Sequence, residues 1–457
     1  MRGPDAAAGP GSANASSEPG PPRSADFPGV GAPRRAAAIA FVALGALLVV
    51  VIVMTTPWHL LPGGRGSADP ARDFTHAQIA RNRAFGSALN PPVYAGLVAG
   101  LVAVLVLGLT PLGARVLRPV IRPSRRWPLQ VIGAAVVLSG LMRLVGLPFD
   151  VWSTTVLQRY GLSTQSWGGW IVDQLTSFGV TLAIWIIALL GLHLLIRRFP
   201  RRWWAGAAAG GFVLVAVASF TYPVVVEPLF NSFKPMPAGP LRSDLLAMAR
   251  SDGVPVGDVL VADASKRTSA LNAYVSGFGS TRRIVVYDTL LASEPPREIE
   301  LIVAHELGHA KRDDVLYGTL VGALGVAAGV CLLHLVITSP RLLRRAGAES
   351  AADPRSIALL LAGVTVLTQV AAPVQNLVSR HIEARADVHS LGLTRDPETF
   401  VKMQRALSVR NLDDLSPNPV DYVLWNNHPT GPERISMGRD WARLHHVPVP
   451  PPLAGRP

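Results

Sequence analysis

Long apolar runs constrain this chain most strongly. A helix needs about 20 mostly apolar residues to cross the hydrocarbon core of a bilayer. Seven segments meet or approach that length, namely Ala36–Thr55, Val93–Ala114, Pro128–Leu147, Ser177–Ile196, Ala205–Val226, Val315–Ile337 and Ile357–Val374. Since 49% of the 457 residues are hydrophobic and only 16% are charged, we predict a mainly α-helical, polytopic membrane protein with about seven transmembrane helices and lipid as its surroundings.

The net charge of +13 does not indicate a nucleic-acid partner. Arginines cluster in the short connections between apolar runs, which is typical of topology signals. They do not form a basic face with interleaved aromatic residues. The single cysteine, Cys331, excludes an intrachain disulfide and a cysteine-based metal site. Any metal must therefore be held by histidine and carboxylate.

The composition divides the chain into six parts. We expect a disordered N-terminal tail (1–33), five transmembrane helices with their loops (36–226), a polar segment (227–314), two more transmembrane helices (315–374), a second polar segment (375–446) and a Pro-rich tail (447–457). Within the polar segments we expect a helix over Leu241–Ser251, strands over Val256–Ala262, Asn272–Val275 and Arg283–Tyr287, a helix from Pro295-Pro296, a helix over Gln375–Leu393, and a helical cap over 396–446 with a loop at 416–432.

Arg143 lies inside the third apolar run. A charge within a membrane span usually faces a cavity or a partner and is a functional candidate. Because it lies near the end of the run, we also expect that its side chain reaches the membrane interface.

One motif in the first polar segment indicates chemistry. His305, Glu306 and His309 form H-E-x-x-H. On a helix, positions i and i+4 lie on one face, so the two imidazoles can bind one metal, and zinc fits this spacing. Glu306 could take a proton from water that the metal activates. Chance occurrence in a chain of this composition is the alternative.

A third ligand is expected beyond the seventh apolar run. Glu383 and Asp387 are four residues apart and share one helical face. We predict that Glu383 completes the site and that Asp387 accepts a hydrogen bond from a metal-bound histidine. The alternative is a solvated charged face that includes Arg380 and Arg385. His381 and His389 are competing ligands, but neither shares that face.

Together these features resemble the type I CaaX prenyl endopeptidases, a family of integral-membrane gluzincin proteases related to HtpX. Further matching segments are Glu227-Pro-Leu-Phe-Asn231, Asn272-Ala273-Tyr274, Arg283-Ile-Val-Val-Tyr-Asp288 and the element His428-Pro429 with Arg434. The resemblance covers roughly residues 90–440. It implies an α+β gluzincin-type zinc protease domain mounted on the seven helices.

The resemblance also implies roles for individual residues. One zinc ion per chain is expected to bind His305, His309 and Glu383. Glu306 is expected to be the general base, and Asp387 to accept a hydrogen bond from a zinc-bound histidine.

Four further residues are expected to contact the substrate. Asn272 and Ala273 resemble the strand edge that pairs with an extended substrate. His428 and Arg434 resemble groups that hold the substrate carbonyl or the oxyanion. Without the resemblance, His428 would be an ordinary loop histidine and Asn272 an ordinary turn residue.

These features predict a membrane-embedded zinc metalloendopeptidase of the cell membrane. Its substrate would be a peptide or protein, with a lipidated CaaX C-terminus as the type substrate of the family or a related membrane peptide. One alternative is an HtpX-like quality-control protease, but that group has fewer membrane spans. Another is a non-catalytic zinc-binding sensor, but the presence of Glu306 in the motif argues for catalysis.

Charge also bears on topology. Short basic loops follow the second, fourth and sixth spans, and Arg34-Arg35 precedes the first. The positive-inside rule places these loops in the cytoplasm and the metal site on the other side. Eukaryotic members of the family have the opposite arrangement, and the arginines of the first loop weaken the charge argument.

Overall fold

The fold of the chain is taken from a computed structural model that describes residues 31–59, 68–122, 126–277, 279 and 282–454. Most of the predicted N-terminal tail lies outside these residues, as do the last three residues of the C-terminal tail. Residues 31–33 differ from the prediction because they already belong to the first helix, α1 (Gly31–Thr55).

Seven described helices are long and apolar enough to cross a membrane, which confirms that prediction. They are α1, α2 (His76–Leu109), α4 (Trp127–Arg159), α5 (Trp167–Arg198), α6 (Trp203–Val225), α10 (Asp314–Ile337) and α12 (Ile357–Thr394). Several extend well beyond their apolar runs. The second ends earlier than predicted, because Pro111 cannot continue the helix and the short α3 (Leu112–Leu117) follows it.

Close packing fixes α12 in the bundle. A Cβ on Gly108 of α2 would lie 2.5 Å from Ala362 Cβ and 2.7 Å from the Ala358 carbonyl oxygen. Only glycine permits this approach, in the way that small residues let membrane helices touch. The position of α12 matters because the same helix continues out of the bundle and carries Glu383 and Asp387.

Arg143 lies midway along α4 and has partners on two helices. Because α4 continues to Arg159, Arg143 is not near a helix end. Its guanidinium pairs with Asp150 of the same helix and donates to Gln174 Oε1 of α5 at 2.9 Å. It therefore has a partner, as an intramembrane charge requires. That its side chain reaches the membrane interface stays a prediction.

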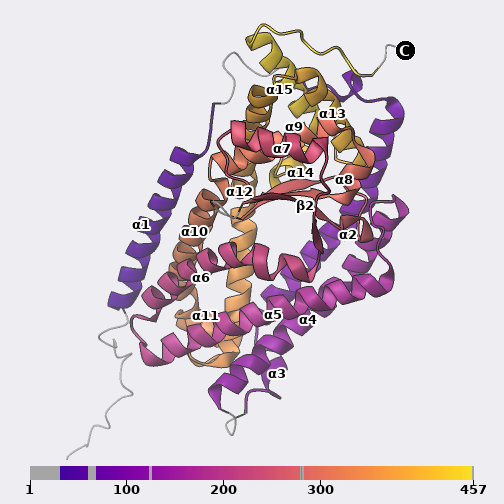
Figure 1. Cartoon of the computed structure of the whole chain (residues 1–457). Helices are drawn as coiled ribbons and strands as arrows, with labels where there is room; N and C mark the ends of the chain where they lie inside the picture. Colours follow the sequence, from indigo (N-terminus) through magenta and orange to yellow (C-terminus); the bar gives the residue numbers. More distant parts are fainter. Residues whose placement is uncertain (1–30, 60–67, 123–125, 278, 280–281, 455–457) are drawn as a thin grey trace, which may run out of the picture.

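The polar domain is built on a four-stranded sheet of order β1-β2-β4-β3. Strands β2 (Asp258–Ala262) and β4 (Arg283–Tyr287) are parallel, whereas β1 (Phe233–Pro235) and β3 (Ala273–Ser276) pair antiparallel with them. Helices α7 (Pro240–Ser251) and α9 (Pro296–Lys311) share one apolar core with the sheet, and Figure 1 shows this layer above the bundle. Strand β1 is too short, and too interrupted by Pro235, to have been predicted.

The remaining elements complete the cap and the turns. They are α8 (Asp288–Ser293), α11 (Pro340–Ala346), α13 (Pro397–Arg410), α14 (Pro419–Leu424), α15 (Gly431–Leu444) and the 3₁₀ turns Pro70–Arg72, Glu227–Leu229, Ala264–Lys266 and Pro354–Ser356. The predicted loop at 416–432 is wrong where α14 forms. Asn418 accepts hydrogen bonds from the N–H groups of Val420 and Asp421, so it caps a helix that Pro419 begins.

Candidate active site

Helix α9 presents the motif residues from the centre of the polar domain. Pro296 at its first turn and Glu298 beside its N-terminus favour helix initiation there. The helix ends before Asp313, whose φ of 52° is left-handed, and α10 begins at the next residue. The motif helix therefore leads through one tight turn into a membrane span.

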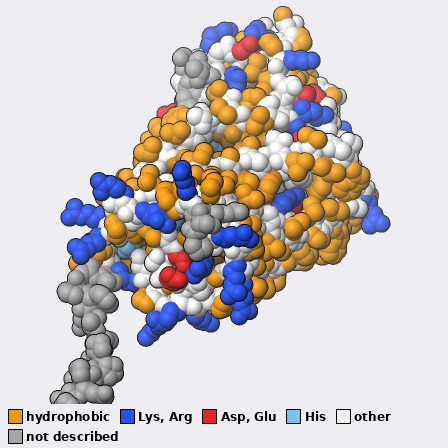
Figure 2. All heavy atoms as spheres, turned by 90° about the horizontal axis from the view of Figure 1, so that it is seen from below, with side chains coloured by type: hydrophobic (Ala, Val, Ile, Leu, Met, Phe, Trp, Pro, Cys, Tyr) orange, Lys and Arg blue, Asp and Glu red, His pale blue; other side chains and the backbone are white. Residues whose placement is uncertain are grey.

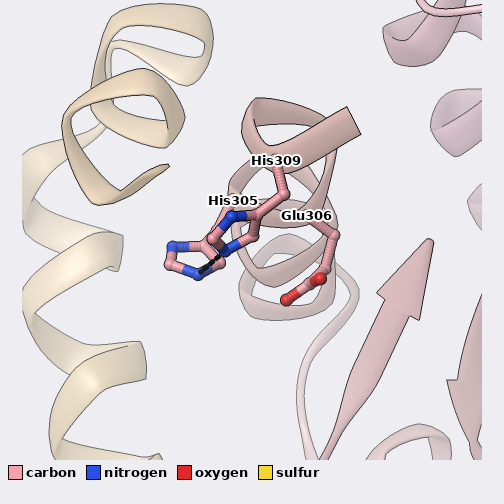
Figure 3. Close-up of side chains that lie close together, drawn as sticks. All are labelled: His305, Glu306 and His309. Carbon is pink, nitrogen blue, oxygen red and sulfur yellow. Dashed lines mark hydrogen bonds between the residues drawn. The ribbon is translucent and has the colours of Figure 1, made fainter. Parts of the chain in front are cut away.

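The side chains of His305, Glu306 and His309 project close together from α9 (Figure 3), and their ligand atoms lie within 4.8 Å of one another. The two Nε2 atoms of His305 and His309 are 3.1 Å apart. This separation is typical of two donors that share a metal, because ligands at about 2.0–2.1 Å from a tetrahedral zinc lie about 3.3–3.4 Å from each other.

Glu383 of α12 joins the two imidazoles. Its Oε2 atom lies 3.1 Å from His305 Nε2, and its Oε1 atom lies 3.6 Å from His309 Nε2. The side chain is mostly buried, with 13% exposed. The structure thus brings together the three residues expected to bind metal, and two nitrogens with one carboxylate form a donor set that suits zinc with an open fourth position.

Asp387 contacts His305 at Nδ1, the ring nitrogen that faces away from Glu383 and His309. Its Oδ1 atom lies 2.9 Å from His305 Nδ1, and its side chain is fully buried. Arg434 donates to the same carboxylate from Nε at 2.7 Å and from Nη2 at 2.5 Å, and Gln404 donates from Nε2 at 3.3 Å. A carboxylate in this place fixes the orientation and tautomer of the ring.

Asp314 holds His309 in the same way. Its Oδ2 atom lies 2.9 Å from His309 Nδ1, and Arg385 of α12 pairs with its other oxygen. The sequence reasoning assigned no role to Asp314 or Arg385. The signal that could have found Asp314 is its position five residues after His309, immediately beyond the end of the motif helix.

Burial and charge set the protonation of the motif residues. Burial raises the pKa of Glu306 above its usual range. Burial lowers the pKa of His309, but its hydrogen bonds to Asp314 and Glu383 outweigh this, so without a bound metal its pKa rises to about 10. The pKa of His305 is raised in the same way by Asp387 and Glu383, against the effect of burial. A metal must displace these protons in order to bind.

His428 lies at the mouth of this cluster. It follows α14, its Nε2 atom is 3.2 Å from Glu383 Oε2, and 49% of its side chain is exposed. Asn427 Oδ1 lies 2.8 Å from its Nδ1. Burial lowers the pKa of His428, and the charge of Glu383 opposes this effect.

The structure gives Arg434 different surroundings from those expected of an oxyanion donor. Its Nε and Nη2 groups both face the fully buried Asp387. Its guanidinium neutralises a carboxylate that would otherwise be buried without a counterion. That Arg434 also contacts the substrate stays a prediction.

Ala273 begins β3, the edge strand of the sheet, and Asn272 immediately precedes it. Ala273 is buried in the core that α9 shares, whereas Asn272 is exposed. The two competing histidines lie elsewhere: His389 pairs with Asp252 at 2.9 Å, and His381 Nδ1 lies 3.0 Å from the Leu377 carbonyl oxygen.

Comparisons with known proteins agree with this arrangement. Residues 235–442 match the model of peptidase family M48, and residues 96–232 match the CAAX prenyl protease N-terminal domain of five membrane helices. The uncharacterized metalloprotease YhfN of Bacillus subtilis is 34% identical over 67% of this chain and 72% of its own length.

Relatives from eukaryotes and a solved structure extend the similarity. A CAAX prenyl protease 1 homolog of Arabidopsis thaliana is 32% identical over 65% of this chain and 71% of its own length. The crystal structure of S. mikatae Ste24p has the same fold, with a TM-score of 0.72 and 21% identity over 89% of this chain and 98% of that chain. The chain therefore belongs to peptidase family M48 and is a multi-pass membrane metalloprotease.

Proposed function

We propose that the chain is a zinc metalloendopeptidase whose single zinc ion is held by His305, His309 and Glu383. The observation that carries the proposal is the convergence of two Nε2 atoms and a carboxylate, with separations of 3.1, 3.1 and 3.6 Å. Asp387 and Asp314 support it, because each holds one imidazole by its second nitrogen. Histidines that bind zinc commonly have such partners.

Zinc in this site would supply Lewis-acid polarisation of the scissile carbonyl and activation of water. Glu306 would accept a proton from the attacking water and later donate it to the leaving amine. Its burial suits this task, because a carboxylate with a raised pKa is a stronger base than an exposed one. We propose that the His428 ring donates a hydrogen bond to the carbonyl oxygen as negative charge develops there.

We propose that the substrate is an extended peptide held along β3. An edge strand offers unpaired main-chain groups, and a peptide that adds as a further strand gains affinity from them. Asn272 and Ala273 stand where this edge begins, on the side of the sheet that contacts α9. Main-chain pairing of this kind would fix the register of the scissile bond but would select few side chains.

We propose an apolar or lipidated C-terminal segment as the substrate class, as in CaaX-type processing or related membrane-peptide cleavage. Several relatives carry the name CAAX prenyl protease 1. A cavity of about 240 Å³ near the far end of β3 also supports this class, since its lining includes Phe220, Val224, Phe233 and Arg283. It is larger than the roughly 150 Å³ apolar cavity that binds benzene in another protein.

The test compares two peptides of one CaaX sequence, prenylated and unprenylated, with purified full-length protein. Glu306→Gln should reduce cleavage of both by at least about 100-fold, while Glu398→Gln, on the exposed face of α13, should leave it unchanged. Full activity of Glu306→Gln would reject the mechanism. Equal rates on the two peptides would reject lipid specificity and leave the mechanism standing.

A further inference from the structure

A ring of arginines surrounds the end of the bundle that lies opposite the metal site. Figure 2 shows these basic side chains from below. We call this ring the basic collar. Its exposed members are Arg35, Arg115, Arg118, Arg122, Arg126, Arg197, Arg198, Arg201, Arg202, Arg341, Arg344 and Arg345.

Four segments far apart in the sequence form the collar. They are the start of α1, the connection from α3 to α4, the connection from α5 to α6, and α11. Arg34 at the start of α1 donates from Nη1 to Thr338 Oγ1 at 2.7 Å, which joins the start of α1 to the end of α10, just before α11. Helices α3 and α11 contact each other. Figure 1 shows both at the end of the molecule away from α9 and α13.

The collar carries almost no compensating charge. The described residues of these four segments include no acidic side chain. Glu349 and Asp353 follow in the connection after α11, and both lie within 4 Å of Arg355. None of the exposed collar arginines forms an ion pair with another described residue of the chain. A concentrated positive charge of this kind is complementary to an anionic partner.

Aromatic side chains lie between the collar and the apolar bundle. The Arg197 guanidinium lies 5.3 Å from the ring of Trp127, and that of Arg198 lies 5.2 Å from the ring of Phe199. The partly buried Trp204 begins α6 next to Trp203, which lies in the core of the bundle. Tryptophan at the boundary between apolar helix and basic loop is typical of the lipid headgroup level, so the anionic partner at this depth is lipid.

The other end of the bundle differs in its short connections. The connection between α4 and α5, residues 160–166, contains no basic residue. In the described part of the connection between α1 and α2, Arg72 is accompanied by Asp69 and Asp73, and Arg81, Arg83 and Arg159 lie in the adjoining turns of α2 and α4. Twelve exposed arginines at the collar thus compare with four among the described residues here, and such an excess marks the cytoplasmic side.

We propose that the basic collar binds anionic phospholipid headgroups of the cytoplasmic leaflet, so that the metal site opens on the opposite side of the membrane. The proposal goes beyond proteolysis and does not depend on it. Its consequence is that substrates approach from outside the cytoplasm. The apolar or lipidated segment proposed above would then be one that is exposed on the outer side of the membrane.

Cysteine labelling in intact cells tests the orientation. The native Cys331 is fully buried and should not react. Glu398→Cys, at the metal-site end, should be labelled by a membrane-impermeant maleimide in intact cells. Glu349→Cys, whose wild-type side chain is 83% exposed beside the collar, should be labelled only after permeabilisation. The reverse pattern, or labelling of both in intact cells, overturns the proposal.

A second pair, Ser416→Cys and Ser350→Cys, repeats the test should a first variant fail to fold. The lipid contact is tested with purified protein and vesicles of phosphatidylglycerol or phosphatidylcholine. Anionic vesicles should raise the thermal midpoint, and combined Arg341→Gln, Arg344→Gln and Arg345→Gln should weaken this binding about 100-fold. Equal effects of the two lipids, or tighter binding of a DNA oligonucleotide than of anionic lipid, would contradict the proposal.

Discussion

The two imidazoles of the site are held by carboxylates in unlike surroundings. Asp387 is fully buried and faces Arg434, itself only 14% exposed. Asp314 faces Arg385, which is 22% exposed and closer to solvent. Each aspartate therefore accepts a hydrogen bond from one imidazole, Asp387 in the interior and Asp314 near the surface. Mutation of the two residues should affect stability differently.

Asp387→Asn should lower both stability and metal affinity. It leaves the Arg434 guanidinium buried without its counterion, which costs about 3–5 kcal/mol of unfolding free energy. Loss of the carboxylate behind His305 should weaken zinc binding about 10–100-fold. Thermal unfolding in detergent and competition with a chromophoric chelator measure the two effects.

Asp314→Asn is the matched variant. It should weaken zinc binding by a similar factor, because His309 loses its partner, but it should change stability much less, since Arg385 can reach water. Equal losses of stability in the two variants would show that burial of Asp387 has no energetic importance.

Zinc affinity should increase with pH. Without metal the pKa of His309 is about 10 and that of His305 is raised, so zinc must displace the proton of His309 at neutral pH. The dissociation constant should therefore become about tenfold smaller per pH unit up to about pH 10. Titrations with a competing chelator at pH 6, 7 and 8 measure this slope, and a flat profile would contradict it.

Sequence reasoning found some residues of the site and missed others for a physical reason. The spacings of His305 with His309 and of Glu383 with Asp387 are local, so a helical period reveals them. The ion pair of Asp387 with Arg434 depends on tertiary packing, and no local pattern specifies it. The role expected for Arg434 at the substrate came from the family resemblance alone.

At the scale of elements, the distance between α9 and α12 sets the site. A Cβ on Gly308 would lie 3.0–3.1 Å from His389 of α12. Glycine at this position lets the two helices approach closely enough for His305 Nε2 and Glu383 Oε2 to lie 3.1 Å apart.

Gly308→Ala should therefore push the helices apart. It should cost about 1–3 kcal/mol of stability through overpacking and should reduce cleavage. Gly392→Ala is the matched control in α12, since nothing lies within 4 Å of its Cβ; it should raise stability by about 0.5–1 kcal/mol through helix propensity. Thermal unfolding and peptide cleavage check both, and a stabilised, fully active Gly308→Ala would contradict the packing argument.

Elements with a strong local pattern could be predicted. The apolar runs gave all seven spans, and the Val- and Ile-rich segments gave β2 and β4. The short elements could not: β1 has three residues, and α14 depends on a cap by Asn418 within a segment rich in turn-forming residues. Their stability comes from neighbours rather than from their own sequence.

At the scale of the whole molecule, one buried ion pair joins the connection after the first span to the C-terminal helix α15. Arg439 of α15 donates from Nη1 to Asp73 Oδ2 at 2.7 Å, and it also donates from Nε to the Pro450 carbonyl oxygen at 3.0 Å. The partners are 366 residues apart, so the sequence gives no signal for this contact. It anchors the cap that carries Arg434 and His428 to the connection between the first two spans.

Asp73→Asn should loosen this connection. It leaves the Arg439 guanidinium, only 3% exposed, without its counterion at a cost of about 3–5 kcal/mol. As a control, Glu398→Gln removes the exposed pair with Lys402 and should cost less than about 1 kcal/mol. Thermal unfolding measures both, and equal effects would show that the buried pair does not anchor the cap.

One metal ion held jointly by α9 and α12 is the centre of the proposed site, and the zinc content of the purified protein tests this most directly. Wild-type protein and Glu306→Gln, purified without chelator, should each contain about one zinc ion per chain, because Glu306 is not a ligand in this account. Glu383→Gln should lose the metal during dialysis that the other two withstand. Retention of a full zinc ion by Glu383→Gln, or its loss from Glu306→Gln, would contradict the assignment of the site.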